Sequence, residues 1–542
     1  MTTTIDTPKA LKSNIQVGLP KLVDPGSPIH IEVLRQWIRD CDDKHQCLRS
    51  QDAPVLPTRL LYVGKHGSAQ PRLICKTGNL KKEEKYMALS HRWGSHPMEG
   101  KLDPLADKIV CTYKKNIRKL EQGFDDSNLP PMYLDAITIA RELEVDYLWI
   151  DSLCIIQQDK SDPLDKGEDW KEESERMEFV FRFAYATLTA SCASSPAERF
   201  LKTRPERECV TMKTDNGSLY YLCDAIDDFS GDVERGELNK RGWVLQERAL
   251  SRRTIYFTEE QTYWECGEGV RCETLTKTKK YVPLREQKTF TLSRSSLANY
   301  PISYSSKASL LGDANFPYSI PSYVKGKKIM LYQDLYERYS KLELSYSTDR
   351  PVAIRGLEKR LLRALDTKGG YGVFDIYLRR GLLWQRDQAS LERIDFSGKE
   401  EQELVPSWSW MAYAGGIRYM NVPLGEVDWD QWDHNIISPW KMAKDDKNAS
   451  LELEVLVHDI KVVEPGARVF LDDPDRTFGR SFKCVILGSS KVSNQGKGET
   501  YYVLIVTSLI LGEMNVYERA GVAFLHKHQI LWDNPATKAR IR

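Results

Sequence analysis

The chain has 542 residues, of which 41% are hydrophobic, and it is therefore long enough to bury more than one core. Its 78 Lys and Arg residues balance 77 Asp and Glu residues, so no overall electric field would draw the chain to nucleic acid or to an anionic membrane. No stretch of about 18 apolar residues indicates a membrane span, and the polar start lacks the apolar segment of a signal peptide. We therefore expect a cytoplasmic protein that has neither a nucleic-acid partner nor a membrane span.

The 11 cysteines are scattered along the chain. The closest pairs are Cys41 with Cys47 and Cys266 with Cys272, and neither pair has the C-x-x-C spacing of a zinc site or a redox centre. The spacing therefore predicts reduced thiols and no metal site.

The first part of the chain reads as a lead-in followed by alternating helices and strands. Residues 1–28 are polar and interrupted by Pro and Gly, which indicates a flexible segment. Helical spacing then puts four apolar side chains on one face: Ile31, Leu34, Trp37 and Ile38. Strands are expected in "LICK" (73–76) and "YMALSHRW" (86–93), because a turn follows the second of these.

Helical and strand patterns alternate from residue 130 onward. A helix is expected to start at the Pro130–Pro131 pair, with an apolar stripe made of Leu134, Ile137 and Ala140. Residues 145–150 read as a strand buried on both faces. Further elements are a helix over 169–183, a strand in 185–191, a helix in 241–250 and two strands after it. The alternation predicts an α/β domain over residues 29–275 with a mostly parallel sheet.

The second half of the chain has a different pattern. Residues 276–325 show weak periodicity and indicate a linker or an irregular segment. Residues 326–445 return to helical spacing and predict a mixed helical region. Residues 446–542 contain short alternating segments, which predict an antiparallel β-rich module.

The helix expected over 169–183 carries one acidic residue on its apolar face. At about 100° per residue, four side chains form the apolar stripe: Trp170, Met177, Phe181 and Ala184. Glu173 lies at the edge of this stripe, whereas Glu172 points away and has a local role in a capping box with Asp169. Glu173 is therefore a candidate functional carboxylate. The alternative is that it edges the stripe or pairs with a buried arginine.

Asp151 and Cys154 follow the strand expected over 145–150. Asp151 stands at the carboxyl end of that strand, where open α/β sheets bind ligands, although Asp also caps turns at such positions. Cys154 could act as a nucleophile only with a base close in space, and no sequence feature brings His91 or His96 to it. The alternative for Cys154 is a buried and unreactive thiol.

Two further segments contain candidate ligand-binding residues. Arg92 could bind a phosphate, Trp93 could stack on a flat ring, and Gly94 would let the backbone approach a ligand closely. The segment "RGWVLQERALSRRT" adds five polar or charged candidates: Gln246, Glu247, Arg248, Arg252 and Arg253. For Arg92 and Trp93 the alternative is an ion pair with Asp and a core position, and for the charged segment it is a solvated helix face or a helix-end clamp. The chain has neither a phosphate-binding G-x-x-x-x-G-K-[ST] loop nor an H-E-x-x-H motif.

Three of these blocks, in this order and spacing, resemble the heterokaryon incompatibility (HET) domain of filamentous fungi. They are "YMALSHRWG" (86–94), the long block over 134–191, and "RGWVLQERALSRRTIYFTEEQTYWEC" (241–266). The resemblance covers about residues 30–270, and downstream segments also look like those that commonly follow HET domains. The family usually has Tyr where His91 stands.

The resemblance implies a domain that triggers programmed cell death when incompatible fungal cells fuse, an allorecognition or innate immune response. HET domains have also been proposed as remote relatives of TIR domains, flavodoxin-like α/β modules of which some cleave NAD. In TIR enzymes the catalytic acid is a glutamate shortly after a tryptophan, and the matching positions here are Trp170 and Glu173. The resemblance therefore implies NAD as a substrate and no further cofactor, with Glu173 as the catalytic acid.

Substrate-binding roles follow from membership of the same three blocks. They are expected for Arg92, Trp93, Gly94, Asp151, Trp170, Gln246, Glu247 and Arg253. TIR-type enzymes also need assembly, so self-association is expected, together with an upstream recognition protein as a possible partner. The competing class is a non-enzymatic module that signals through self-association and its partners, in which the α/β domain is only a scaffold.

Overall fold

The computed structural model describes most of the chain in two compact units, unit 1 (Met1–Phe316) and unit 2 (Pro317–Arg542). Apart from short isolated stretches, the described residues are 22–45, 55–64, 70–81, 84–94, 108–159, 164–206, 208–213, 219–223, 226–274, 323–387, 391–397, 404–442, 451–461, 468–473, 482–491, 499–508 and 514–542. The predicted linker over 276–325 lies almost entirely outside them.

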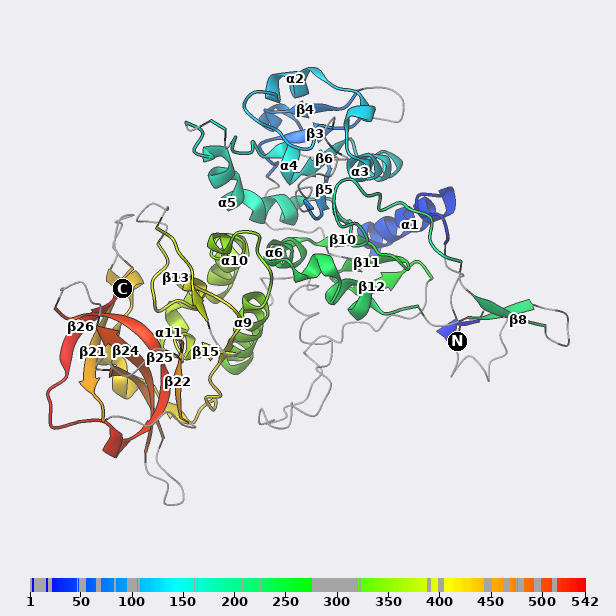
Figure 1. The fold of residues 1–542 in the computed structure, drawn as a ribbon. Coiled ribbons are helices and arrows are strands. Elements are labelled where there is room, and N and C mark those ends of the chain that lie inside the picture. Colours follow the sequence, from blue (N-terminus) through cyan, green and yellow to red (C-terminus); the bar gives the residue numbers. More distant parts are fainter. Residues whose placement is uncertain are drawn as a thin grey trace. The chain divides into compact units, whose positions relative to one another are not determined.

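Unit 1 is built around an eight-stranded sheet with the order β12-β11-β10-β7-β5-β6-β3-β4 (Figure 1). Its strands are β3 (Leu60–Tyr62), β4 (Arg72–Ile74), β5 (Tyr86–Ser90), β6 (Tyr147–Ile150), β7 (Ala186–Thr189), β10 (Arg253–Phe257), β11 (Thr262–Cys266) and β12 (Gly269–Cys272). The four central strands β6, β5, β7 and β10 are parallel. The outer strands pair antiparallel on both sides.

The prediction of a mostly parallel sheet therefore needs a correction. Among the described residues, three of the seven pairings in this sheet are parallel, and the sheet is mixed. The physical reason is local: β10, β11 and β12 are joined by short turns, and short turns permit only antiparallel pairing.

Helices connect the strands of unit 1. They are α1 (Pro28–Lys44), α2 (Ile117–Gln122), α3 (Pro131–Glu142), α4 (Asp151–Cys154), α5 (Glu168–Phe183) and α6 (Gly242–Leu250). Pro131 at the first position of α3 has no N–H to leave unpaired, which explains the start of that helix. The buried face of α3 differs in part from the predicted apolar stripe, because Leu134 is only half-buried while Asp135 is buried.

The predicted capping box at the start of α5 is wrong. Gly167, with φ +65°, precedes the helix and supplies no side-chain cap. The helix begins at Glu168, which places Asp169 inside its first turn. The Asp169 carboxylate instead accepts a hydrogen bond from the Ile156 N–H (2.7 Å) and pairs with Arg59.

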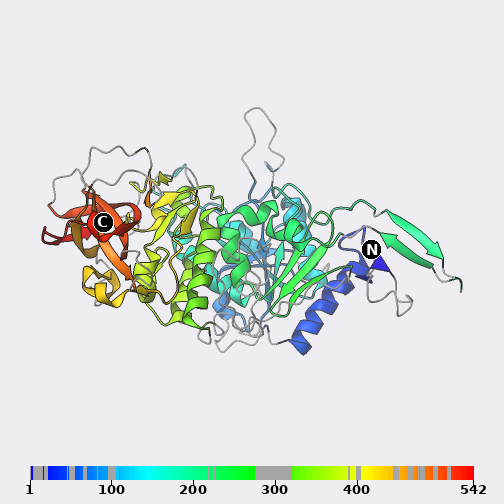
Figure 2. The ribbon, with the colours of Figure 1, turned by 90° about the horizontal axis from the view of Figure 1, so that it is seen from below.

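Helix α1 packs along β10, β11 and β12, as Figures 1 and 2 both show. The expected apolar face is confirmed, since Ile31, Leu34, Trp37 and Ile38 are all buried. The Trp37 and Trp264 rings lie 6.4 Å apart, and Asp40 at the polar edge pairs with Arg271 at 2.9 Å. Apolar burial and edge ion pairs thus join a helix near residue 40 to strands near residue 265.

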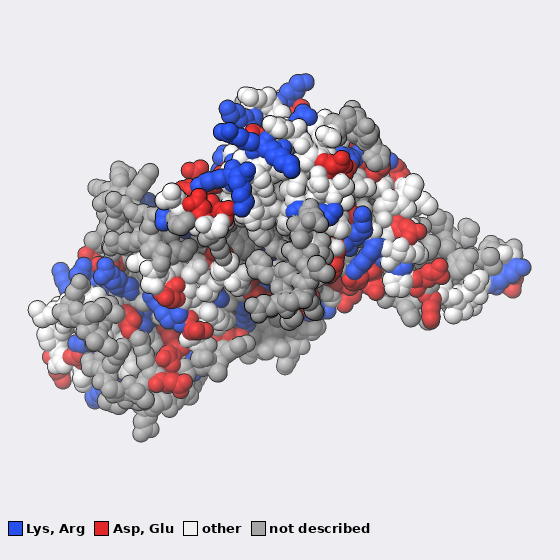
Figure 3. All heavy atoms as spheres, turned by 45° about the horizontal axis from the view of Figure 1, so that its top comes forward, with Lys and Arg blue, Asp and Glu red and all other residues white. Residues whose placement is uncertain are grey.

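Charged side chains are unevenly distributed over unit 1. Figure 3 shows Lys and Arg gathered over the end of unit 1 that carries α2. Two lysines just before α2 are paired, Lys114 with Asp165 (3.0 Å) and Lys115 with Asp159 (2.9 Å).

None of the helices in the described part of the chain combines the length and the apolar composition that a membrane crossing needs.

Unit 2 begins with helices α9 (Lys325–Ser340) and α10 (Arg355–Leu365) and continues into a second eight-stranded sheet. Its strands are β19 (Val427–Asp428), β20 (Ile436–Ile437), β21 (Leu453–Asp459), β22 (Val469–Leu471), β23 (Phe482–Ser490), β24 (Thr500–Ser508), β25 (Val516–His526) and β26 (Thr537–Ile541). Most pairings are antiparallel, as predicted, and β25 with β26 is parallel. The pairing of β21 with β23 closes five of the strands into a ring, which removes exposed edges.

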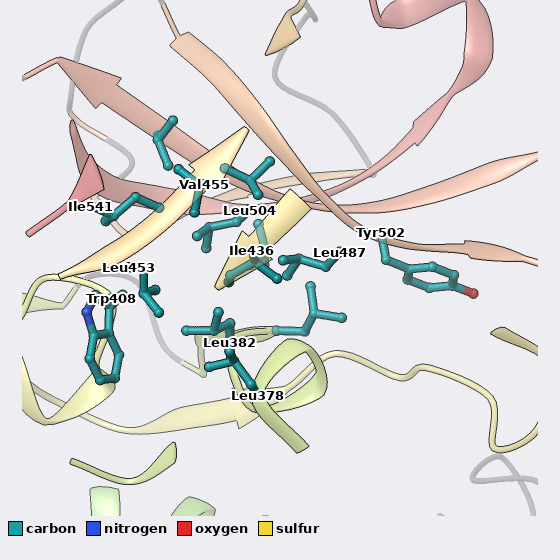
Figure 4. Close-up of a cluster of buried hydrophobic side chains, with 14 of the residues drawn as sticks. Leu378, Leu382, Trp408, Ile436, Leu453, Val455, Leu487, Tyr502, Leu504 and Ile541 are labelled. Atoms are coloured by element: carbon teal, nitrogen blue, oxygen red, sulfur yellow. The ribbon is translucent and has the colours of Figure 1, made fainter. Parts of the chain in front are cut away.

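The remaining short elements are β1 (Thr2–Thr3), β2 (Gln16–Val17), β8 (Cys209–Lys213), β9 (Leu219–Cys223), β13 (Gly369–Gly370), β14 (Val373–Phe374), α11 (Leu378–Gly381), β15 (Trp384–Arg386), β16 (Glu392–Arg393), β17 (Tyr413–Ala414), β18 (Ile417–Tyr419) and α12 (Pro439–Met442). Figure 4 shows how the core of unit 2 joins its two halves: Leu378 and Leu382 around α11 face Leu453 and Leu504 of the sheet. The predicted helical and β-rich regions therefore share one apolar core.

Candidate functional site

The carboxyl ends of β5 and β6 lie side by side, because Leu89 pairs with Ile150. The next residues along each strand are Ser90 and Asp151. Strand β6 follows β5 on one side, whereas β7 pairs with the other side of β5. The strand order therefore reverses at β5, and open α/β sheets bind ligands at the carboxyl ends of strands around such a reversal.

Asp151 is the most accessible carboxylate at this edge. Its Oδ2 accepts a hydrogen bond from Trp93 Nε1 (2.7 Å), and its Oδ1 accepts one from the Ser152 N–H (2.7 Å). The Asp151 side chain is 23% exposed, and Trp93 is 41% exposed. A carboxylate and an indole ring are therefore presented to solvent together, in contact with each other.

Glu247 is a second carboxyl at the same edge and has a different environment. It lies on α6, is buried, and accepts a hydrogen bond from the Ser90 hydroxyl. Burial raises the pKa of Glu247 to about 7, although the Ser90 bond acts in the opposite direction, and the charge of Asp151 raises it further. Glu247 therefore exchanges a proton near neutral pH, as a general acid or base must.

His91 is a buried member of the same cluster. Its Nδ1 lies 3.8 Å from Asp151 Oδ1, and its ring meets the Tyr133 ring edge-on at 5.6 Å. Arg241 donates from Nη1 to the His91 carbonyl oxygen at 2.8 Å, which fixes the backbone after β5. Burial lowers the pKa of His91, and the opposing charge of Asp151 does not reverse this, so the imidazole is neutral.

Glu173 is buried on α5 but belongs to a different cluster. Its Oε1 accepts a hydrogen bond from Thr58 Oγ1 (2.6 Å) and lies 4.0 Å from Arg59 and 3.7 Å from Arg176. Arg59 in turn donates from Nε to the Cys154 carbonyl oxygen at 2.6 Å. The structure thus supplies the pairing with a buried arginine that was the structural alternative for Glu173. The same arginine holds the end of the turn that begins at Asp151.

The remaining candidates from the sequence are spread over unit 1. Arg92 interacts electrostatically with Glu198 and Glu237. A hydrogen bond from Ser194 lowers the pKa of Glu198 most, and one from Lys240 lowers that of Glu237 most, while the charge of Arg92 makes a smaller contribution to each. The Trp170 ring packs edge-on against Trp243 of α6 at 6.1 Å. These contacts keep both candidates within the domain that carries the cluster.

Gly94 and Gln246 both lie in closely packed surroundings. Gly94 has φ +79°, and a Cβ there would lie 2.7 Å from Ser195 Cβ, so both the conformation and the space require glycine. Gln246 is fully buried on α6, next to Glu247. Their expected contact with a substrate stays a prediction.

Arg253 does not join the other candidates. It stands at the amino end of β10, where its buried guanidinium pairs with Asp42 of α1 and lies 5.2 Å from the centre of the Tyr185 ring. The sequence could not separate the two ends of that strand, because a block match does not say which way each side chain points.

Cys154 is a core residue. It is buried, its thiol faces the Leu148 carbonyl oxygen at 3.9 Å, and burial raises its pKa to about 12. A thiol with such a pKa is a poor nucleophile at neutral pH. His96, one of the two bases considered for it, lies outside the described residues.

Sequence reasoning missed the contributions of Ser90, Tyr133 and Arg241. Each of them acts through a contact between segments far apart in the chain; Ser90, for example, meets Glu247 at a separation of 157 residues. The one available signal was position, since Ser90 ends a strand whose neighbour ends in Asp151.

Fold and site together define an α/β domain with two unlike carboxyls at the carboxyl edge of its parallel strands. Residues 86–247 match the family model described as heterokaryon incompatibility protein (HET), and this range contains β5, β6, β7 and every member of the cluster. These residues are therefore a HET domain, as the three blocks indicated. No curated protein and no solved structure was found to match it.

Proposed function

We propose that this chain is a cytoplasmic effector of cell death in heterokaryon incompatibility, and that its HET domain hydrolyses NAD to nicotinamide and an ADP-ribose product. One observation carries the enzymatic part: the partly exposed Asp151 carboxylate and the buried Glu247 lie at the same edge of the sheet, where burial and the charge of Asp151 raise the pKa of Glu247 to about 7. Carboxyls with unlike environments in one site are typical of enzymes that use acid–base chemistry.

The reaction breaks the bond between nicotinamide and ribose. Nicotinamide leaves as a neutral molecule while the ribose carbon gains oxocarbenium character. Asp151 is the carboxylate that reaches solvent, so we assign it the stabilisation of that positive charge. The exposed Trp93 ring, bonded to the same carboxylate, offers a stacking surface for nicotinamide or adenine.

Glu247 is assigned the proton transfer that accompanies attack by water. It is buried, and in this proposal the Ser90 hydroxyl, which donates a hydrogen bond to it, relays the proton. Water attack at the ribose carbon releases one proton, and a carboxyl with a pKa of about 7 is half-ionised near neutral pH and able to take it.

Glu173 receives a positioning role in this proposal. The TIR resemblance assigns it the role of catalytic acid, but its contacts to Thr58, Arg59 and Arg176 support a part in fixing the α4 turn that begins at Asp151. The parallel strand order β6-β5-β7-β10 equals the order 2-1-3-4 of flavodoxin-like sheets, which supports the proposed kinship with TIR domains.

The test is nicotinamide release from NAD by the full-length protein, including its assembled states. Asp151→Asn is expected to slow release by about 100-fold or more. Glu247→Gln should remove an ionisation near neutral pH from the plot of rate against pH. Glu173→Gln should lower the rate at every pH and leave the shape of that plot unchanged. Glu172→Gln alters an exposed residue next to Glu173 and should retain activity.

Three results would count against these assignments. If the wild type releases no nicotinamide in any assembled state and still kills cells, the domain acts as a non-enzymatic signalling module. If Glu173→Gln removes all turnover while Asp151→Asn keeps it, the catalytic acid is Glu173, as the TIR resemblance implies. If Glu172→Gln and Glu173→Gln are equally active, Glu173 has neither role.

A further inference from the structure

Four metal-binding side chains meet on the side of unit 1 where α1 packs against β11. They are Cys41 in the last turn of α1, His45 and Cys47 just after it, and Cys266 at the end of β11. One ligand atom from each residue lies within 4.8 Å of the three others. The three cysteines are buried and His45 is half-buried.

The spacing of these atoms suits tetrahedral zinc. With Zn–S bonds of about 2.3 Å and Zn–N bonds of about 2.0 Å, a tetrahedron places its sulfur and nitrogen ligands about 3.5 Å apart and its sulfurs about 3.8 Å apart. The distance between Cys266 Sγ and His45 Nδ1 is 3.5 Å. Three thiols and one imidazole form one of the usual ligand sets of structural zinc sites.

Backbone geometry prepares both halves of the cluster. The His45 N–H makes the last helical hydrogen bond of α1, to the Cys41 carbonyl oxygen at 3.3 Å, and the chain leaves the helix at His45 in an extended conformation. Cys47, two residues further on, lies close to Cys41. Cys266 begins the tight turn between β11 and β12, where it pairs with Gly269.

A buried positive charge lies next to the cluster. The Arg253 side chain has no exposed surface, and its charge lies close enough to Cys41 to interact with it electrostatically. Among the described residues its Nε and Nη1 have no hydrogen-bond partner, although its Nη2 bonds to Asp42. One Zn²⁺ with three thiolates and a neutral imidazole carries a net charge of about −1, which Arg253 would offset.

We propose that Cys41, His45, Cys47 and Cys266 bind one Zn²⁺ ion that fastens α1 to the β11–β12 hairpin. All four ligands come from this chain and are largely buried, so the site has no open position for a substrate and is structural. The ion joins segments 221 residues apart and stabilises unit 1 where the hairpin is the edge of the sheet.

A disulfide is the competing use of these thiols. It would engage two of the three cysteines and leave one thiol and His45 without a role, whereas zinc uses all four groups. A metal-bound state also suits an environment that keeps thiols reduced. Mass spectrometry of the protein purified without reductant distinguishes the two states.

The experiment measures metal content in full-length protein purified without chelator. The expected result is one equivalent of zinc per chain, retained on dialysis. Replacement by Co²⁺ should give the charge-transfer and ligand-field absorption of a tetrahedral thiolate complex. Both measurements use the wild type, so they stand even if a cysteine variant fails to fold.

Variants locate the site. Cys47→Ser and Cys266→Ser should each lose most of the zinc, and a strong chelator should lower the unfolding temperature of the wild type. Cys484→Ser, which replaces a buried thiol in unit 2, should keep one equivalent. The proposal is overturned by wild type without zinc and without cobalt–thiolate absorption, by a native disulfide among Cys41, Cys47 and Cys266, or by equal zinc loss in Cys484→Ser.

Discussion

Replacing Glu247 with glutamine removes a carboxyl that the folded protein keeps protonated up to near-neutral pH. In the folded state the pKa of Glu247 rises from 4.5 to about 7, first because of burial. The folded chain therefore binds one more proton than the unfolded chain between these two pH values. The contribution of the Glu247 carboxyl to folding stability is complete at pH values below its unfolded pKa and is lost as pH rises through its folded pKa.

The size of the effect follows from the shift. Each pKa unit corresponds to about 1.4 kcal/mol, so a shift of roughly 2.5 units makes the wild type about 3 kcal/mol less stable at about pH 9 than at about pH 4, from this group alone. Glu247→Gln cannot ionise and keeps a hydrogen-bonding group beside Ser90. The variant should therefore lack this part of the pH dependence.

Amide hydrogen exchange is the suitable assay, because it reports opening of unit 1 separately from unit 2. Protection of amides in β5 and α6 is compared between wild type and Glu247→Gln at about pH 5.5 and at about pH 8.5, with rates corrected for intrinsic exchange. Glu172→Gln, which removes an exposed carboxylate, should follow the wild type. If Glu247→Gln keeps the wild-type pH dependence, Glu247 is ionised in the folded state and cannot hold the proton assigned to it.

Three further predictions concern packing and the thiol. Gly94→Ala should destabilise unit 1 by about 1–3 kcal/mol in thermal unfolding, because residue 94 has a positive φ and an added Cβ would contact Ser195. Ser195→Gly should recover part of the lost stability. A Gly94→Ala variant as stable as the wild type would contradict the described turn. Arg519→Met should lower the free energy of unfolding of unit 2, measured in urea, by about 3–5 kcal/mol, because it leaves the buried Asp472 without its partner. A decrease below about 1 kcal/mol would mean that the ion pair contributes little to stability. Cys154→Ser should leave nicotinamide release unchanged; complete loss in a folded variant would restore the nucleophile alternative.

Periodicity predicted the individual elements of unit 1 well. The apolar face of α1, the start of α3 at Pro131 and the buried strand before Asp151 are all confirmed, because each depends on residues close together in the chain. The start of α5 was wrong by one residue. Gly167 takes a left-handed conformation there, and the pattern of side chains does not reveal backbone conformation.

The candidate site was predicted only in part. Asp151 and Trp93 were found from their positions after strands, and the structure joins them by a hydrogen bond. The raised pKa of Glu247 was beyond prediction, since it arises from burial and from Ser90 and Asp151, and burial depends on how α6 packs. Glu173 was correctly placed on a buried face, but the identity of its partners Thr58 and Arg59 required the fold.

The sequence by itself determined the HET domain over residues 86–247, the alternation of helices and strands, and the residue types available for chemistry. These follow from local spacing and from blocks that keep their order. The tertiary structure alone decided strand direction in the mixed sheet, the separation of Glu173 and Arg253 from the Asp151 cluster, and the meeting of Cys41 with Cys266. Each of these depends on contacts between residues far apart in the chain, and such contacts arise from the packing of whole faces rather than from the spacing of neighbouring residues.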